Sequence, residues 1–244
     1  MWHWDYQYLP FADTHRVLIP DLIGSGLSDK PEATYSPEQV LEYFLTFMDR
    51  LAITRATLIG NSMGAGLAMA LALDHPNRVE RLVLISGFPA QVEANVALPQ
   101  LQQFLRYRPP QWLASIGNRM TGRASTERFL KKIVYQPKLI SPTVIERSYQ
   151  NRQRGGLLSP LYSLLEHIDS WDEHYGKRIS DISHPTLIIW GAHDPIFPVE
   201  VGQQIQHLLP HAEWHNIPEA GHLPQWEQPN QVNPIILSFL EKDL

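Results

Sequence analysis

The stretch from residue 56 to residue 74, ATLIGNSMGAGLAMALALD, determines the predicted fold. Its first part, Ala56–Gly60, is an apolar run typical of a strand in a parallel sheet that is covered on both faces. Its last part, Met63–Asp74, is rich in the helix formers Ala, Leu and Met. The pentapeptide Gly60–Gly64 lies between the two. A G-x-S-x-G sequence at a strand-to-helix turn predicts a nucleophile elbow, in which a strained backbone lifts the Ser62 hydroxyl above the sheet.

The position of this pentapeptide between a strand and a helix supports the nucleophile-elbow prediction more strongly than its residues alone do. Five-residue patterns recur by chance, and the alternative is a tight turn around a buried serine without chemistry. Glycines two positions before and two after Ser62 leave room for a crowded turn. Because the pattern also falls between a strand and a helix, it favours an exposed nucleophile.

Strand-like and helix-like runs alternate along the chain outside its middle. Short apolar or β-branched runs predict further strands, which are Arg16–Pro20, Arg81–Ser86, Thr186–Trp190 and Glu213–Ile217. Amphipathic stretches predict helices at Pro37–Leu51 (after the N-cap residue Ser36), Val199–Leu209 and Val232–Leu240. This alternation predicts an α/β fold with a mostly parallel sheet flanked by helices.

The middle of the chain, residues 89–183, follows a different pattern. Strand-like runs are rare there, and apolar residues fall in helical or loop contexts. We therefore predict a helical cap inserted between two strands, with residues 1–88 and 184–244 forming the α/β core. The alternative is an ordinary run of crossover helices. Aromatic residues of the insertion suggest an apolar substrate, or equally form its own core; they are Phe104, Tyr107, Trp112, Phe129 and Tyr162.

Two predicted strand ends supply the partners that a nucleophilic serine requires. Asp194 follows the strand Thr186–Trp190, and His222 follows the last strand, Glu213–Ile217. The carboxyl ends of parallel strands share one edge of the sheet, where open α/β sheets place their sites. A base needs an orienting carboxylate, and the order here is serine, acid, histidine. The sequence thus predicts Ser62 as nucleophile, Asp194 as acid and His222 as base.

Other residues near these loops are weaker candidates for the base. His193 flanks Asp194 and therefore lies in the loop of the acid. His215 lies inside a predicted strand and His211 precedes it, so we expect both histidines to be structural.

The alternative acids are Asp172, Asp181 and Glu219. Asp181 comes before its strand rather than after it, and Asp172 lies in the insertion. Asp21 is expected instead to fix the turn Asp21–Gly26, which lacks the lysine–serine ending of a phosphate-binding Walker loop.

Composition excludes several other classes of function. The chain has 244 residues and no cysteine, which removes disulfides, thiolate metal sites and a cysteine nucleophile. A formal net charge of −5 gives it no electrostatic reason to bind nucleic acid or an anionic membrane. Metal-binding and dinucleotide-binding spacings are missing, so we expect neither a metal nor a cofactor. With no long apolar stretch and no signal peptide, we expect a cytoplasmic protein that acts on a small molecule.

Four segments resemble the α/β-hydrolase family, in its esterase-like branch with a lid. They are RVLIPDLIGSGLSDKP (16–31), TLIGNSMGAGLAMALALDHPNRVERLVLIS (57–86), PTLIIWGAHDPIFP (185–198) and IPEAGHLPQWEQPNQVNPIILSFL (217–240). The resemblance implies the same three roles for Ser62, Asp194 and His222. It also implies that the Met63 N–H is one donor of the oxyanion hole.

A serine at the elbow narrows the reaction that this resemblance implies. Relatives that open epoxides or displace halide use aspartate there, so Ser62 indicates acyl transfer. We expect hydrolysis of an ester or related acyl bond of a small apolar substrate through an acyl-enzyme. GNSMG together with GHLPQWE is similar to the meta-cleavage-product hydrolases, which makes carbon–carbon bond hydrolysis the alternative. A second alternative is a non-catalytic homologue that only binds a ligand.

One departure from the family pattern concerns the N-terminus. Members of the family normally have strands before the one matching Arg16–Pro20, and a His-Gly loop among them supplies the second oxyanion donor. Only Met1–His15 precede that segment here, so we expect an N-terminally truncated chain. The strand without a counterpart would lie between Arg16–Pro20 and Ala56–Gly60, and its loss would leave unpaired backbone groups or force the two to pair directly.

Overall fold

A single parallel sheet organises the protein. The computed structural model describes residues 2–108, 110–154 and 158–242. Four strands lie in the order β1-β2-β3-β4, and each pairs with its neighbours in parallel. They are β1 (Ala56–Asn61), β2 (Val79–Ile85), β3 (Thr186–Gly191) and β4 (Glu213–Ile217). This arrangement confirms the predicted α/β fold, and four of the five predicted strands form within two residues of their expected bounds.

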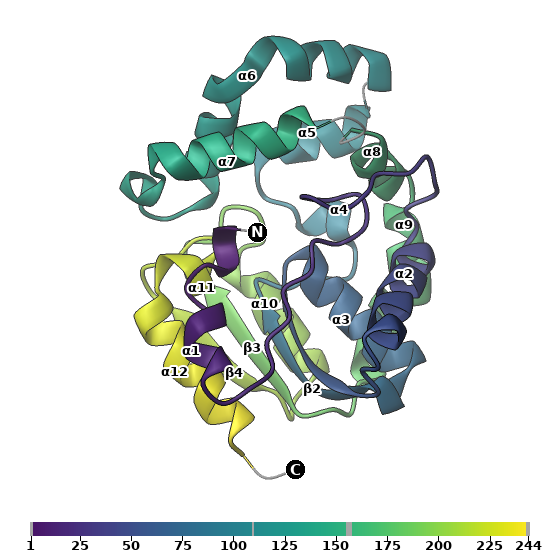
Figure 1. Cartoon of the computed structure of the whole chain (residues 1–244), viewed down its shortest axis with the longest axis vertical. Helices are drawn as coiled ribbons and strands as arrows, with labels where there is room; N and C mark the ends of the chain where they lie inside the picture. The colour runs from purple at the N-terminus through teal and green to yellow at the C-terminus, as the bar shows by residue number, and fades with distance from the viewer. Residues whose placement is uncertain (1, 109, 155–157, 243–244) are drawn as a thin grey trace.

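Helices cover both faces of the sheet. Alternate residues of β2 point to opposite sides, so Leu82 and Leu84 join one hydrophobic cluster, whereas Val83 and Ile85 join another. The first cluster also takes side chains from α2 (Pro37–Arg50), α3 (Met63–Asp74) and α10 (Val199–Leu208). The second takes them from α1 (Tyr8–Ala12) and α12 (Pro229–Leu240). The result is a three-layer α/β core (Figure 1).

The predicted helix boundaries follow from local signals. Helix α2 begins after Ser36, whose hydroxyl accepts a hydrogen bond from the Gln39 N–H at 3.3 Å, with Pro37 in the first turn. Helix α3 spans the predicted residues, and α12 begins three residues earlier than expected, at Pro229. The short elements of the core are η1 (Trp2–Trp4), η2 (Pro76–Arg78) and α11 (Pro224–Glu227).

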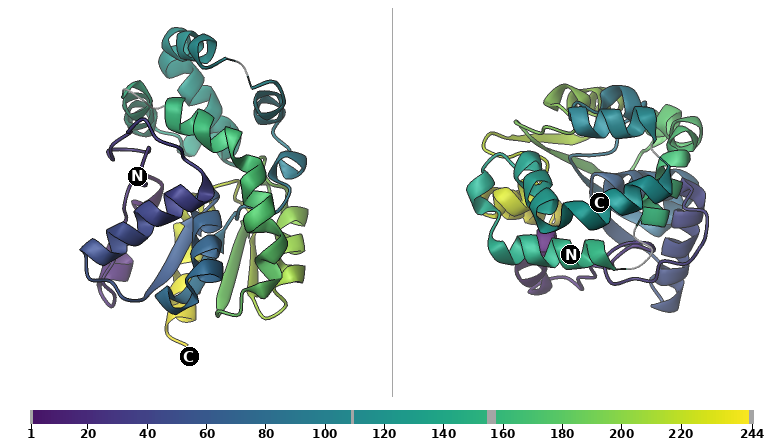
Figure 2. Two further views of the ribbon diagram at one scale, coloured as in Figure 1. Left: turned by 90° about the vertical axis from the view of Figure 1, so that its right-hand side faces the viewer. Right: turned by 90° about the horizontal axis from the view of Figure 1, so that it is seen from above.

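In the part of the chain that the structure describes, the segment between β2 and β3 contains helices joined by loops and no strand. Its elements are α4 (Val92–Asn95), α5 (Pro99–Tyr107), α6 (Gln111–Ile133), η3 (Pro137–Leu139), α7 (Pro142–Gln153), α8 (Leu158–Glu166), α9 (Ile168–His174) and η4 (Gly176–Asp181). Helices α5, α6 and α7 lie beyond the end of the sheet toward which the strands point (Figures 1 and 2). None of the helices in the described ranges is both long and apolar enough to cross a membrane.

The aromatic residues of this segment have two different environments. Tyr107, Trp112 and Phe129 are exposed, with 72%, 66% and 46% of their areas accessible. Phe104 and Tyr162 instead pack against each other, with ring centroids 5.7 Å apart. The three exposed side chains therefore give no support to an apolar substrate pocket.

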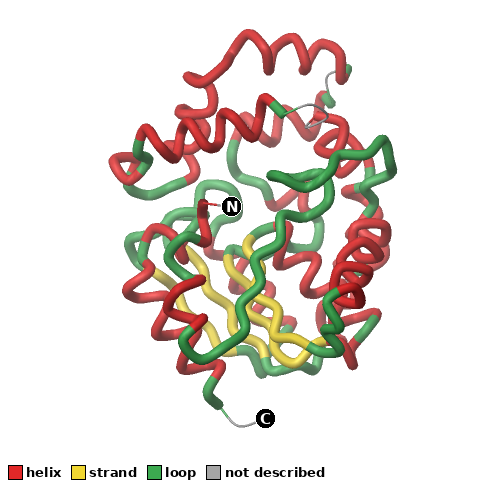
Figure 3. The backbone as a smooth tube through the Cα atoms, viewed as in Figure 1, coloured by secondary structure: helices red, strands yellow, loops and turns green. Residues whose placement is uncertain are grey.

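The prediction of a strand at Arg16–Pro20 is wrong. These residues form a loop (Figure 3, green), and Leu18 and Ile19 are 42% and 37% exposed. A cavity of about 710 Å³ lies between this loop and β1, and residues 16–20 and 56–61 line its two sides. A strand requires a partner edge for its N–H and C=O groups, and the cavity keeps the nearest edge out of reach. Strand β1 is consequently an edge of the described sheet.

Candidate active site

The turn between β1 and α3 has the strained conformation expected of an elbow. Ser62 has φ 54° and ψ −121°, in a region that non-glycine residues rarely adopt. Its N–H donates to the Ile85 carbonyl at 2.9 Å, and its own carbonyl accepts from the Ala65 N–H at 2.9 Å. A Cβ on Gly60 would lie 2.3 Å from the Gly64 backbone, so this turn needs glycine there. The observed turn therefore presents Ser62 at the carboxyl end of β1.

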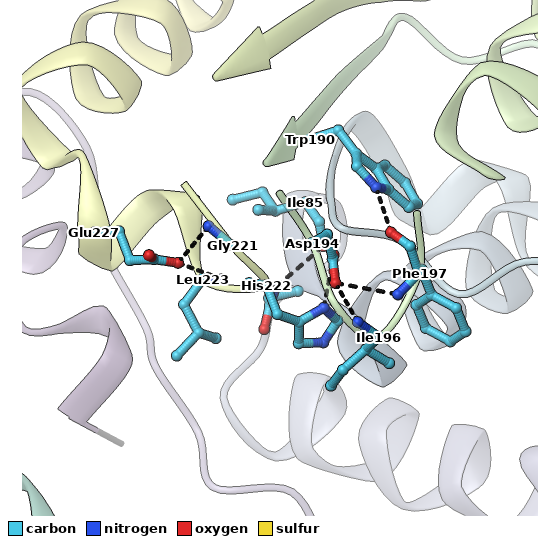
Figure 4. Close-up of polar contacts among 10 residues, drawn as sticks. Ile85, Trp190, Asp194, Ile196, Phe197, Gly221, His222, Leu223 and Glu227 are labelled. Atoms are coloured by element: carbon cyan, nitrogen blue, oxygen red, sulfur yellow. Dashed lines mark hydrogen bonds and ion pairs between the residues drawn. The ribbon is translucent and has the colours of Figure 1, made fainter. Parts of the chain in front are cut away.

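Asp194 and His222 form a buried pair at the ends of β3 and β4 (Figure 4). One carboxylate oxygen of Asp194, Oδ2, lies 2.8 Å from His222 Nδ1. The other, Oδ1, accepts hydrogen bonds from the N–H groups of Ile196 at 2.8 Å and Phe197 at 3.1 Å. An ionised carboxylate can only accept, so this pairing places a proton on Nδ1 and leaves the Nε2 lone pair for a substrate or nucleophile.

Asn61 connects the elbow to the loop of His222. Its side-chain Nδ2 donates to the Ile85 carbonyl at 3.2 Å and to the His222 carbonyl at 3.1 Å. Among the described residues, no hydrogen bond joins Ser62 Oγ to His222 Nε2. Such catalytic contacts often shorten only when a substrate binds. Asn61 was not among the predicted site residues, although its place beside Ser62 in GNSMG was an available signal.

The backbone at the start of α3 can stabilise a developing negative charge. Met63 is the first helical residue, and within the described chain its N–H has no hydrogen-bond acceptor. Free N–H groups and the helix dipole both favour an anion at a helix N-terminus. The oxyanion role of Met63 stays a prediction.

The cavity beside β1 extends to this site. Ser62 and Met63 contribute to its wall together with largely apolar side chains, among them Phe11, Phe44 and Phe47. His3 also lines it, and burial lowers the pKa of His3 to about 4, so its imidazole is neutral at pH 7. His3 could not be predicted from the sequence, because nothing local to η1 indicates where its side chain packs.

The residues considered as alternatives have other partners. His193 stacks on Tyr135 with ring centroids 4.3 Å apart, and His211 Nε2 lies 3.1 Å from the His184 carbonyl. Asp172 accepts a hydrogen bond from the Gln91 N–H. Asp21 accepts from the Leu27 N–H at 2.8 Å, as expected of a residue that fixes a turn. Within the described ranges, no group of three or more His, Asp or Glu side chains is placed to bind a metal ion.

Substitution of Gly191 should separate the two loops that carry Asp194 and His222. A Cβ on Gly191 would lie 1.9 Å from the Gly221 carbonyl oxygen and 2.6 Å from that of Ala220. We expect Gly191→Ala to lower the free energy of unfolding by about 3 kcal/mol in urea titrations, because backbone atoms must move apart. Gly64→Ala is the matched control, since its Cβ would meet nothing within 4 Å. Equal stability of the two variants would contradict this account of the packing.

The family model that describes the alpha/beta hydrolase fold matches residues 3–229. This chain belongs to the α/β-hydrolase fold family. A relative from Burkholderia vietnamiensis is 32% identical over 235 residues, which cover 93% of this chain and 77% of the relative. One from Paraburkholderia phymatum is 33% identical over 233 residues, covering 93% and 76%. Both are named 2-hydroxy-6-oxononadienedioate/2-hydroxy-6-oxononatrienedioate hydrolase.

Solved α/β-hydrolase structures give the same assignment. A meta-cleavage product hydrolase from Pseudomonas fluorescens is 25% identical, with a TM-score of 0.82 over 98% of this chain and 84% of that one. A structure described as an N-acyl homoserine lactone degrading enzyme is 26% identical, with a TM-score of 0.74 over 97% and 87%. The protein is thus a hydrolase in the branch that includes the meta-cleavage product hydrolases. The dienedioate hydrolase and meta-cleavage product hydrolase names support the alternative of carbon–carbon bond hydrolysis better than ester hydrolysis.

Proposed function

We propose that the protein hydrolyses a carbon–carbon bond of a 2-hydroxy-6-oxo-dienoate, with Ser62 as nucleophile, His222 as base and Asp194 as acid. The observation that carries the proposal is the buried contact of 2.8 Å between Asp194 and His222 beside the Ser62 elbow. The substrate class comes from relatives of that name, which are 32% and 33% identical over 93% of this chain.

Cleavage of the C5–C6 bond leaves its electron pair on C5, so the reaction requires a group that can accept that pair. Transfer of the 2-hydroxyl proton to C5 converts the dienol into a 2,6-diketone with a C3–C4 double bond. Ser62 Oγ then attacks the C6 carbonyl while His222 Nε2 takes its proton. The Met63 N–H stabilises the oxyanion. When the C5–C6 bond breaks, its electron pair moves through C4 and C3 onto the C2 oxygen, which regains a proton from His222.

Water completes the reaction at the acyl-serine. His222 takes a proton from the water molecule, which attacks C6, and the Ser62–acyl bond breaks to release a carboxylic acid and free enzyme. Asp194 stabilises the imidazolium in both halves. We further propose that residues 89–183 form a cap over this site, which the location of α5, α6 and α7 beyond the carboxyl ends of the strands supports (Figure 2).

A direct comparison of two substrate classes tests this function. We expect kcat/KM for a 2-hydroxy-6-oxo-dienoate, followed by loss of its dienolate absorbance, to exceed that for p-nitrophenyl butyrate by about 10²-fold or more. Ser62→Ala serves as the blank for both assays. A higher kcat/KM for the ester would overturn the carbon–carbon assignment. It would favour an ester or lactone hydrolase, the function suggested by the N-acyl homoserine lactone degrading enzyme.

A further inference from the structure

The carboxylate of Glu227 is buried and has no part in the proposed reaction. Its side chain lies at the end of α11, and the residue is only 6% exposed. Oε1 accepts hydrogen bonds from the Gly221 N–H at 2.8 Å and the Leu223 N–H at 3.2 Å (Figure 4). Oε2 accepts one from the Tyr135 N–H at 2.6 Å. One carboxylate therefore contacts three backbone N–H groups from two distant parts of the chain.

The first two of these donors flank the proposed base. Gly221 and Leu223 are the immediate neighbours of His222, and through their N–H groups Glu227 holds the Ala220–Gly221 and His222–Leu223 peptide groups. Hydrogen bonds to an ionised carboxylate are roughly twice as strong as those between neutral groups. The backbone position at His222 sets where its side chain begins, so these hydrogen bonds bear on the direction of Nε2.

The third donor comes from the helical segment between β2 and β3. The end of α6 and the two residues after it, Ile133–Tyr135, lie against the His222 loop, and the Ile133 carbonyl accepts from the His222 N–H at 2.8 Å. A Cβ on Gly221 would lie 2.7 Å from that carbonyl oxygen and 2.8 Å from the Tyr135 N atom. The Tyr135 ring also stacks on His193, next to Asp194. Ile133–Tyr135 thus contacts the loops of both the acid and the base.

Burial of the Glu227 carboxylate is unfavourable in itself. Burial raises the pKa of Glu227 above the ordinary value of a glutamate, although its N–H partners favour the charged form. A side chain that only filled space here would be apolar, since burying a carboxylate costs free energy unless it is hydrogen-bonded.

We propose that Glu227 is a positioning residue for His222, and that it couples the base to Ile133–Tyr135 through the Tyr135 N–H. This inference rests on the proposed role of His222 as base. It does not depend on the substrate, since any acyl transfer by Ser62 requires a correctly directed Nε2.

Labelling of Ser62 by a fluorophosphonate tests this proposal without a natural substrate. The rate of adduct formation, followed by intact mass, gives a maximal rate kinact and an apparent affinity KI. We expect Glu227→Ala to lower kinact by about 10²-fold and to leave KI within about threefold, because a base displaced by about 1 Å loses that much rate. Glu227→Gln keeps the side-chain size and one acceptor oxygen, so its kinact should fall between those of Glu227→Ala and the unmodified protein.

The matched controls are Glu219→Ala and Glu219→Gln, which change the same residue type at an exposed position in the same loop. Both should label like the unmodified protein, and thermal melts show whether each variant is folded. The proposal is overturned if folded Glu227→Ala labels within about threefold of the unmodified protein, or if the loss lies in KI instead. It is also overturned if both Glu227 variants are unfolded, since the carboxylate would then be a folding group. Unmodified protein that takes no label would refute the role of His222 itself, whereas labelled protein that leaves the dienoate intact refutes only the substrate.

Discussion

Ser62→Ala is expected to lower kcat by about 10⁶-fold, because the variant lacks the atom that forms the acyl-enzyme. Because the Ser62 hydroxyl is absent, no fluorophosphonate adduct should form on the variant. Substrate affinity should change little, since the apolar wall of the cavity stays in place. The measurement is kcat for the dienoate together with intact mass after labelling.

Ser25→Ala is the appropriate control for this substitution. Ser25 lines the same cavity but belongs to a different segment, the turn that follows Asp21. We expect the control to keep its adduct and its kcat. Residual turnover by Ser62→Ala above about 1% would mean that another group is the nucleophile. Full ligand binding by an unmodified protein that neither labels nor turns over substrate would instead favour the non-catalytic homologue.

Asp194→Asn is expected to lower kcat by about 10⁴-fold through the wrong tautomer of His222. The N–H groups of Ile196 and Phe197 both point at Oδ1, so the amide oxygen of Asn must take that place. The amide NH2 then faces His222 Nδ1, which can only accept. The ring proton moves to Nε2, and the lone pair that would receive the Ser62 proton is lost.

Two measurements separate this mechanism from simple unfolding. Nitrogen NMR of the imidazole should show the proton on Nδ1 in the unmodified protein and on Nε2 in Asp194→Asn. Circular dichroism should show both to be folded. Asp181→Asn, an exposed position at the end of η4, is the matched control and should keep its kcat. A loss of less than about tenfold in Asp194→Asn would remove Asp194 from the acid role.

The sequence by itself determined the secondary-structure elements that carry the candidate site and the order in which Ser62, Asp194 and His222 follow along the chain. The runs that became β1 and β3 are apolar or β-branched and bounded by turn residues, and the bounds predicted for β1, β3 and β4 agree with the structure to within one residue. The helix after Ser62 follows from local composition. Once the strands are known to be parallel, Asp194 and His222 must fall on the edge where β1 ends, because side chains after the strands share that edge.

Only the tertiary structure decided which segments meet. Arg16–Pro20 has the composition of a strand, yet it forms a loop, and a cavity lies between it and β1, so the two segments do not pair. Glu227 and Tyr135 are 92 positions apart, and Asn61 and His222 are 161 apart, yet each pair is joined by a hydrogen bond. Helix and strand preferences depend on the spacing of apolar residues over a few neighbouring positions, so a local stretch of sequence is enough to predict them. Contacts across such separations depend on how whole layers pack, which no local pattern contains.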